Sequence, residues 1–368
     1  MMFADLLPKT TAPEEEEGEL VFCSSEEGVR EVTKIRPAGK LLFVTDGSAF
    51  KAFRNCLPSR ALCLVLDSDD CLPLFLTSDD IAMVVAAGQK NTLVSARFFA
   101  QIRKIPCALF PVSATLDGVY EPRGSVLLGG AEDSVPLKAA KVCCDRALLA
   151  PSLGQAYMRL LLARLALIEA QTLQGLGMEE GGEDARERAY RTLLPLKSKT
   201  LSFEEVALKN AEIRRCEQGG MRIGEGKILA EEIGRNGEEK AFFLLAALYT
   251  AFFLRGKPRL RVPDYAARAK AASAAYCQQR VPTLQEFAHR TAAFERIRGK
   301  VGRELEDFLE GEMHYKKNFY ELTGRAIVGV NGASPLKNLP EKAGGLSSVI
   351  RDFGLMEWNE EDIFQKSV

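Results

Sequence analysis

Histidine is almost absent from this chain, since only His289 and His314 occur in 368 residues. The two lie 25 residues apart, with no second histidine or cysteine close to either. Histidine-based metal sites use closely spaced ligands, such as a pair one helical turn apart. We therefore interpret both as surface or interhelical side chains. The C-x-x-C spacing of redox and zinc motifs is also missing, because Cys143 and Cys144 are adjacent and read as buried thiols.

Excess charge and long apolar runs are missing as well. The formal net charge is −1, which gives no general attraction to nucleic acid or to anionic lipid. The most apolar run, Ala241 to Leu254, is shorter than a membrane span and is interrupted by Tyr249 and Thr250. No basic stretch followed by an apolar one opens the sequence, so we expect no signal peptide. Nine irregularly spaced cysteines predict reduced thiols, and hence a cytoplasmic protein. Self-association is the one macromolecular partnership left open.

The length favours two domains, because 368 residues exceed the usual size of a single core. Short apolar runs typical of strands dominate residues 1–150, whereas long helical patterns dominate residues 151–368. We predict an α/β N-terminal domain, with a mostly parallel Rossmann-like sheet, and an all-α C-terminal domain. The predicted helices of the second domain are Gln155–Leu176, Phe203–Cys216, Gly226–Ile233, Lys240–Leu254, Asp264–Gln279 and Leu284–Leu309.

One stretch, Ile81 to Pro122, organises the first domain. The Val-rich run Ile81–Ala87 predicts a buried strand, and residues 88–91 break it. Helical spacing follows over Thr92–Ile102, and Cys107–Phe110 is a second apolar strand. A βαβ unit places both turns at the carboxyl edge of a parallel sheet, where open α/β sheets bind ligands. The helix start there suits a phosphate, since its N–H groups attract anions and Lys90 adds positive charge.

Acidic residues follow two of the other predicted strands. Asp46 ends the run Lys40–Thr45, and it could accept hydrogen bonds from a ribose or cap the helix that follows it. The cluster at residues 67–70 follows the run Ala61–Leu66 and lacks the glycine and distal glutamate of a calcium loop, so we interpret it as a solvated turn. The remaining predicted strands are Glu19–Cys23, Gly124–Gly129 and Lys141–Cys144, with a helix from Ser24 to Ile35 after the first.

The segment IPCALFPVSATLDGVYEP, with the elements around it, resembles the dehydroquinate synthase-like and iron-containing alcohol dehydrogenase superfamily. The glycerol-1-phosphate dehydrogenase branch is the most similar. Gly88 stands in the place of the family's glycine-rich turn, and Thr115, Asp117 and Gly118 match its T-x-x-S-x-D-G-type motif. The resemblance implies NAD or NADP as cofactor. The cofactor-binding residues it implies are Asp46, Gly88, Gln89, Lys90, Asn91, Thr92, Ser113 and Thr115.

The metal site of that superfamily is where this sequence departs from it. Relatives hold one divalent metal through an aspartate and two histidines of the helical domain. The matching positions here are Ala163, the Lys227–Glu231 segment and Asn236, and the only acid on the first of these helices is Glu169. We therefore expect no bound divalent metal. The resemblance implies Asp117, Lys227 and Asn236 as substrate-binding residues, and it leaves the catalytic residue unassigned.

Two functions compete on this basis. The first is a divergent NAD(P)-dependent dehydrogenase of a small polyol or polyol phosphate, with its metal ligands replaced. The second is a non-catalytic binding or regulatory protein, a pseudoenzyme that keeps the dehydrogenase fold. The absent metal ligands favour the second, while Asp46, Gly88, Thr115 and Asp117 favour the first.

Overall fold

The computed structural model describes residues 20–34, 39–47, 49–78, 80–178, 181–255, 283–330, 334–336 and 339–352. The helix predicted over Asp264–Gln279 lies outside them, as do residues 1–18. The chain divides into two compact units. The first unit consists of Met1–Ala156 and Phe203–Gln218, and the second of Tyr157–Ser202 and Gly219–Val368.

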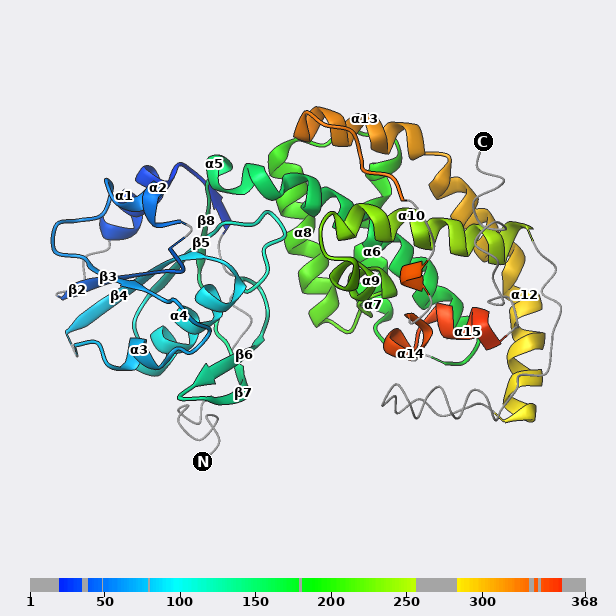
Figure 1. Ribbon diagram of the computed structural model, residues 1–368, viewed down its shortest axis with the longest axis horizontal. Helices are drawn as coiled ribbons and strands as arrows, with labels where there is room; N and C mark the ends of the chain where they lie inside the picture. The colour runs from blue at the N-terminus through cyan, green and yellow to red at the C-terminus, as the bar shows by residue number, and fades with distance from the viewer. Residues whose placement is uncertain are drawn as a thin grey trace. The chain divides into compact units, whose positions relative to one another are not determined.

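Six parallel strands form the sheet of the first unit, in the order β1-β8-β5-β4-β2-β3 (Figure 1). Each was predicted from a short apolar run. For the central strands β4 and β5 this pattern follows from burial on both faces, because a strand covered on both faces is apolar at consecutive positions. The predicted βαβ unit is present, with β4 and β5 as parallel neighbours. The strands are β1 (Leu20–Phe22), β2 (Lys40–Thr45), β3 (Leu62–Val65), β4 (Ile81–Gly88), β5 (Cys107–Pro111) and β8 (Lys141–Cys144).

Helices cover the two faces of this sheet. On one face α1 (Ser25–Lys34) and α2 (Phe50–Phe53) enclose a core in which Phe53 packs against Phe43 and Phe110. The helix α1 confirms the helix predicted after β1, and a reciprocal pair of hydrogen bonds between Ser24 and Glu27 caps its start. The other helices of this unit are α3 (Leu72–Phe75), α5 (Arg146–Leu149), the 3-10 turn Ala150–Ser152 and α8 (Phe203–Gln218).

The helix of the βαβ unit, α4, spans Lys90–Arg103 and begins two residues before the predicted start at Thr92. All of its residues from Thr92 to Ala100 are buried, so more than one face of the helix is covered. A hairpin explains the second buried face: β6 (Arg123–Leu128) pairs antiparallel with β7 (Ala131–Pro136) and packs on α4. A Cβ on Gly124 of β6 would lie 2.5 Å from Val94 of α4, so only glycine fits there.

Asp70 holds the turn of this hairpin. It belongs to the acidic cluster at residues 67–70, which we interpreted from the sequence as a solvated turn. Asp70 accepts hydrogen bonds from the N–H groups of Leu72, Gly129 and Gly130 at 2.9, 3.0 and 3.1 Å. These backbone donors lower the pKa of the Asp70 carboxyl. The strand β7 was not predicted, because it carries Glu132 and Asp133 and is largely exposed.

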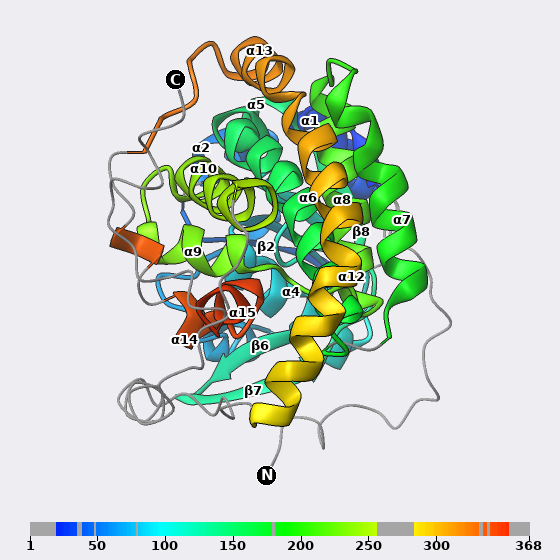
Figure 2. The same ribbon diagram turned by 90° about the vertical axis from the view of Figure 1, so that its right-hand side faces the viewer.

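Among its described residues, the second unit contains helices and no strand, as predicted. Its helix α10 contacts both α9 and α12 (Figure 2). Thr283 and Glu286 form a capping box at the start of α12. The helix α7 was not predicted, because its sequence is mostly charged. The elements are α6 (Leu153–Gly175, whose first residues belong to the first unit), α7 (Glu183–Leu193), η3 (Leu194–Lys197), α9 (Glu225–Ile233), α10 (Gly237–Thr250), the π-helical η4 (Ala251–Arg255), α12 (Leu284–Leu309), α13 (Glu312–Thr323), η5 (Ser334–Leu336), α14 (Leu339–Ala343) and α15 (Leu346–Asp352).

Within the described part of the chain, no helix is both long enough and apolar enough to cross a lipid bilayer. The long helix α6 illustrates this, because charged residues such as Arg159, Arg164 and Glu169 interrupt its apolar sequence.

Candidate functional site

The carboxyl ends of β2, β4 and β5 lie next to one another and form the candidate site. In the sheet register Thr45 lies beside Ala87, and Gly88 beside Pro111. Asp46, Gln89 and Ser113 therefore follow neighbouring strands at the same edge. The parallel sheet brings these three predicted segments together as the βαβ pattern requires.

Asp46 is bound to the turn that follows β4. Its Oδ2 accepts a hydrogen bond from the N–H of Gln89 at 2.6 Å. A Cβ on Gly88 would lie only 2.7 Å from the same oxygen and 3.1 Å from Cβ of Thr92. Gly88 is therefore needed because the carboxylate approaches the backbone closely. The helix after Asp46 is not capped by it, since α2 starts after Ala49, so that alternative of the sequence analysis was wrong.

The start of α4 faces the solvent at this edge. Gln89, Lys90 and Asn91 are exposed, whereas Thr92 is 4% exposed. Gln89 precedes the helix in an extended conformation, without capping it through its side chain. The Asn91 amide donates to Asp69 at 2.7 Å, which ties the helix start to the acidic turn after β3. The first N–H groups of a helix have no partner within the helix, so this end carries partial positive charge.

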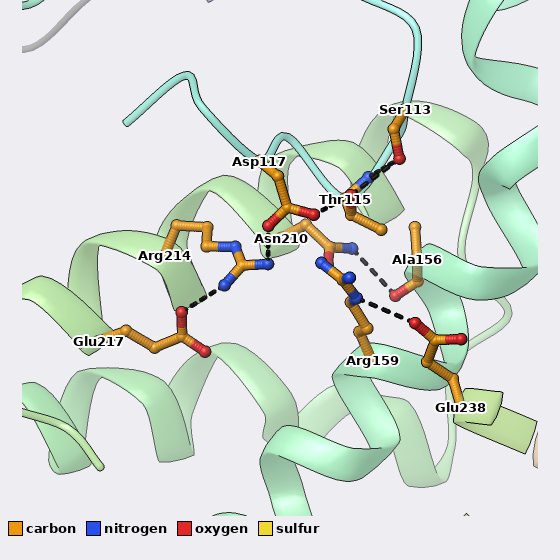
Figure 3. A network of polar contacts seen from close by, with 9 residues as sticks. All are labelled: Ser113, Thr115, Asp117, Ala156, Arg159, Asn210, Arg214, Glu217 and Glu238. Atoms are coloured by element: carbon orange, nitrogen blue, oxygen red, sulfur yellow. Dashed lines mark hydrogen bonds and ion pairs between the residues drawn. The ribbon is translucent and has the colours of Figure 1, made fainter. Parts of the chain in front are cut away.

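Ser113, Thr115 and Asp117 form a hydrogen-bonded chain after β5 (Figure 3). The Ser113 and Thr115 hydroxyls lie 2.8 Å apart, and Thr115 donates to Asp117 Oδ2 at 2.8 Å. Leu116 between them has φ 54°, a left-handed conformation that costs a non-glycine residue about 1 kcal/mol or more. Gly118 follows with φ 82°. The turn is thus fixed in a specific, strained shape.

A buried arginine of α8 neutralises Asp117. Arg214 is 7% exposed and pairs with Asp117 Oδ1, while its other terminal nitrogen lies 2.6 Å from Glu217 (Figure 3). Asn210, one turn earlier, donates to the carbonyl of Ala156 at 3.1 Å. These contacts join α8 to the rest of the first unit. This pair could not be predicted from the sequence, since a charged residue of a helix is normally expected on a solvated face.

A second buried arginine supports the same turn from α4. Arg97 is 3% exposed, and it donates to the Gly118 carbonyl at 3.0 Å and to the Lys138 carbonyl at 2.8 and 3.1 Å. Burial lowers the pKa of its guanidinium. Gly118 also touches the start of α4, because a Cβ there would lie 2.7 Å from the Lys90 carbonyl oxygen. The turns after β4 and β5 are therefore in direct contact.

The positions that match the family's metal ligands lie in the second unit. Ala163 is buried in α6, Lys227 is half-buried on α9 and Glu231 is exposed. Asn236 stands before α10 with φ 54°, a left-handed position that asparagine tolerates well, so its place is explained by the turn. A methyl group, an ammonium and a turn amide do not fit a three-ligand zinc or iron site.

No cluster of three or more histidine, cysteine, aspartate or glutamate side chains suited to a metal occurs among the residues with described positions. His289 is exposed on α12, and His314 is half-buried on α13. These positions agree with their interpretation as surface and interhelical side chains.

Sequence reasoning missed a buried acidic pair in the second unit. Glu169 of α6 and Glu225 of α9 are each 1% exposed. The N–H of Ser347 donates to both Glu225 oxygens, at 2.9 and 3.0 Å, and Arg222 lies 3.3 Å from Glu169. Burial, and next the charge of Glu169, raise the pKa of Glu225 to about 8. Burial and the same two carboxyls raise the pKa of Tyr249 well above its usual value. The pair therefore holds a proton near neutral pH.

Comparison with known proteins gave similarity in structure only. No family model matches the sequence, and no curated protein does. An iron-containing alcohol dehydrogenase from Corynebacterium glutamicum is similar over 97% of this chain and 99% of its own, at 12% identity and a TM-score of 0.47. A maleylacetate reductase from Rhizobium sp. strain MTP-10005 is similar over 92% and 97%, at 16% identity and a TM-score of 0.44. A glycerol dehydrogenase from Schizosaccharomyces pombe is similar over 86% and 94%, at 12% identity and a TM-score of 0.43.

Proposed function

We propose that this chain binds NAD at the carboxyl edge of β2, β4 and β5, as a divergent NAD(P)-dependent dehydrogenase of a polyol or polyol phosphate. The observation that carries the proposal is the hydrogen bond from Gln89 N–H to Asp46, which joins the tip of β2 to the turn before α4. In nucleotide-binding α/β sheets, an acidic residue at a strand tip binds the ribose and a helix start binds the pyrophosphate.

Two charged places at this edge bind different parts of the dinucleotide. The exposed start of α4, with Lys90 on its first turn, attracts the pyrophosphate. The Asp46 carboxylate accepts hydrogen bonds from ribose hydroxyls, and it repels a phosphate on the ribose 2′-oxygen. NAD is therefore favoured over NADP.

The substrate end of this site is less complete. Asp117, expected to bind substrate, already shares its carboxylate with Thr115 and Arg214. Lys227 and Asn236, the other substrate-binding residues that the resemblance implies, belong to the second unit. A cation such as Lys227 attracts the phosphate of a polyol phosphate better than it attracts a neutral polyol. Asn236 is explained by its turn. No described residue is assigned as the proton acceptor of hydride transfer.

These contacts favour a second candidate function, a nucleotide-binding protein without turnover. Its supporting observation is the buried Asp117–Arg214 pair, because a carboxylate held this way is withdrawn from a substrate hydroxyl. The donor set at Ala163, Lys227 and Asn236 supports the same candidate, since it supplies no metal to polarise a substrate oxygen.

Isothermal titration calorimetry with NAD, NADP and ADP-ribose tests the nucleotide site. We expect NAD and ADP-ribose to bind, NADP to bind more weakly, and Lys90→Ala to weaken all three. At 100 times its dissociation constant, NAD then stabilises the fold by about 2.7 kcal/mol. The control is Lys34→Ala, which removes an exposed lysine at the end of α1, where the crossover returns to the opposite edge of the sheet.

Binding of none of the three nucleotides would overturn both candidates. The two candidates are then separated by incubating NAD with glycerol, glycerol 1-phosphate and related polyols, and following NADH by absorbance. Sustained NADH formation that is lost in Lys90→Ala supports the dehydrogenase. Binding without turnover supports the non-catalytic protein.

A further inference from the structure

The outermost strand of the sheet, β3, has an open edge. It is last in the strand order, and β2 is its only neighbour among the strands with described positions. Leu62 and Val65 are 37% and 39% exposed, and Cys63 is exposed as well. The strand thus presents apolar side chains and a row of backbone groups to its surroundings.

No charge, proline or bulge within the described strand protects this edge against strand addition. Natural edge strands carry a lysine, a proline or a bulge, which prevent pairing with another chain. Between Ala61 and Leu66 there is no charged residue and no proline. The register between β2 and β3 is regular over all four pairs, so no bulge turns the edge away.

The charges at the two ends of β3 identify the occupant. Arg60, before the strand, and Asp67, after it, are both exposed. When a second copy of the strand runs antiparallel to the first, Arg60 of each copy comes close to the Asp67 end of the other. In a parallel pair, like charges would face each other instead. The strand is therefore complementary to itself in the antiparallel orientation.

We propose that β3 is a homodimer interface, at which a second copy of this chain pairs antiparallel with the first and joins the two sheets. Twofold symmetry places one residue of the strand opposite itself in the second copy. For a strand of this length that residue is at or next to Cys63. The proposal does not depend on the proposed function.

Sedimentation or light scattering on the full chain is the first test. We expect a mass twice the 40.5 kDa of the monomer. The double variant Leu62→Lys, Val65→Lys places unpaired charge at the interface and should give a monomer. Both side chains are already partly exposed, so the fold tolerates the change, and circular dichroism confirms this. Leu208→Lys, which alters a leucine that is 48% exposed on α8, is the matched control and should remain dimeric.

Charge exchange tests the orientation. Arg60→Asp alone and Asp67→Arg alone should each raise the dimer dissociation constant several-fold, and the double exchange should restore it. Cross-linking tests the register, because opposite residues of an antiparallel pair have Cα atoms within disulfide range. Oxidation with copper–phenanthroline should give a covalent dimer that Cys63→Ser abolishes.

A monomeric full chain would overturn the proposal. A dimer that survives the double lysine variant would place the interface elsewhere and overturn it too. Failure of the double charge exchange to restore pairing would exclude the antiparallel arrangement.

Discussion

The backbone N–H of Glu225 donates to Oε2 of Glu169 at 3.0 Å, and the Tyr249 hydroxyl lies 3.3 Å from one carboxyl and 3.5 Å from the other. Two carboxyls that are both 1% exposed cannot be charged together cheaply. A Cβ on Gly345 would lie within 2.5 Å of both, so the chain leading into α15 closes over them.

The stability of the protein should therefore fall as the pH rises. The pKa of Glu225 is raised from about 4.5 to about 8, so the folded state retains a proton that the unfolded state has already released. The contribution of Glu225 to stability is complete below the pKa that it has in the unfolded state. It is lost as the pH rises through the higher pKa that it has in the folded state. The free energy of unfolding should fall by up to about 1.4 kcal/mol per pH unit in this window.

Urea unfolding at several pH values measures this slope. Glu225→Gln, which cannot ionise, should flatten it. The control Glu187→Gln changes an exposed glutamate of α7 and should leave the slope as it is. A Glu225→Gln protein with the unaltered slope would show that other groups cause the dependence.

Removal of the Arg214 side chain should destabilise the first unit. Arg214→Ala leaves Asp117 and Glu217 without their buried counter-charge, at a cost of about 3 kcal/mol. The control is Arg215→Ala, because Arg215 is 29% exposed in its pair with Glu212 and should contribute about 1 kcal/mol or less. Urea unfolding distinguishes the two, and equal losses would contradict the role assigned to Arg214.

The contact between the turns after β4 and β5 should depend on Gly118. Gly118→Ala would place a Cβ on a residue with φ 82°, at 2.7 Å from the Lys90 carbonyl oxygen. The substitution should therefore lower the free energy of unfolding by about 2 kcal/mol or more, and it should weaken NAD binding. Gly129→Ala has the same kind of backbone, with φ 59°, but nothing lies within 4 Å of its Cβ. It should cost about 1 kcal/mol and leave binding unchanged. Calorimetry and urea unfolding together measure both effects.

The purified protein should contain no stoichiometric zinc, iron or nickel, because Ala163, Lys227 and Asn236 do not supply a three-ligand set. Elemental analysis of protein prepared without chelators is the measurement. One tightly bound metal per chain, lost in Glu231→Ala or Asn236→Ala, would contradict this and restore a metal-dependent mechanism.

The sheet could be predicted from the sequence because its strands are short apolar runs between polar breaks. The run Ile81–Gly88 is buried at nearly every position, and no other element explains such a sequence at that length. The hairpin strand β7 and the helix α7 could not be predicted this way, because both are polar and derive their order from neighbours distant in the sequence.

The position of the candidate site in the fold could be predicted from the sequence, but the contacts of its side chains could not. Asp46 was expected either to accept ribose hydroxyls or to cap the helix after it, whereas its described partner is the backbone of Gln89, 43 residues later. Arg97, Arg214 and Glu225 were not singled out at all. A charged residue on a helix is usually solvated, and only the packing of distant segments shows that these three are buried.

The composition of the first unit has a consequence for synthesis of the protein on the ribosome. The unit takes in Phe203–Gln218 after the chain has already passed through Tyr157–Ser202 of the second unit. A nascent chain ending at Ala156 would contain every strand that the structure describes, yet Asp117 would still lack Arg214. The first unit therefore cannot finish folding before part of the second unit, Tyr157–Ser202, has been translated.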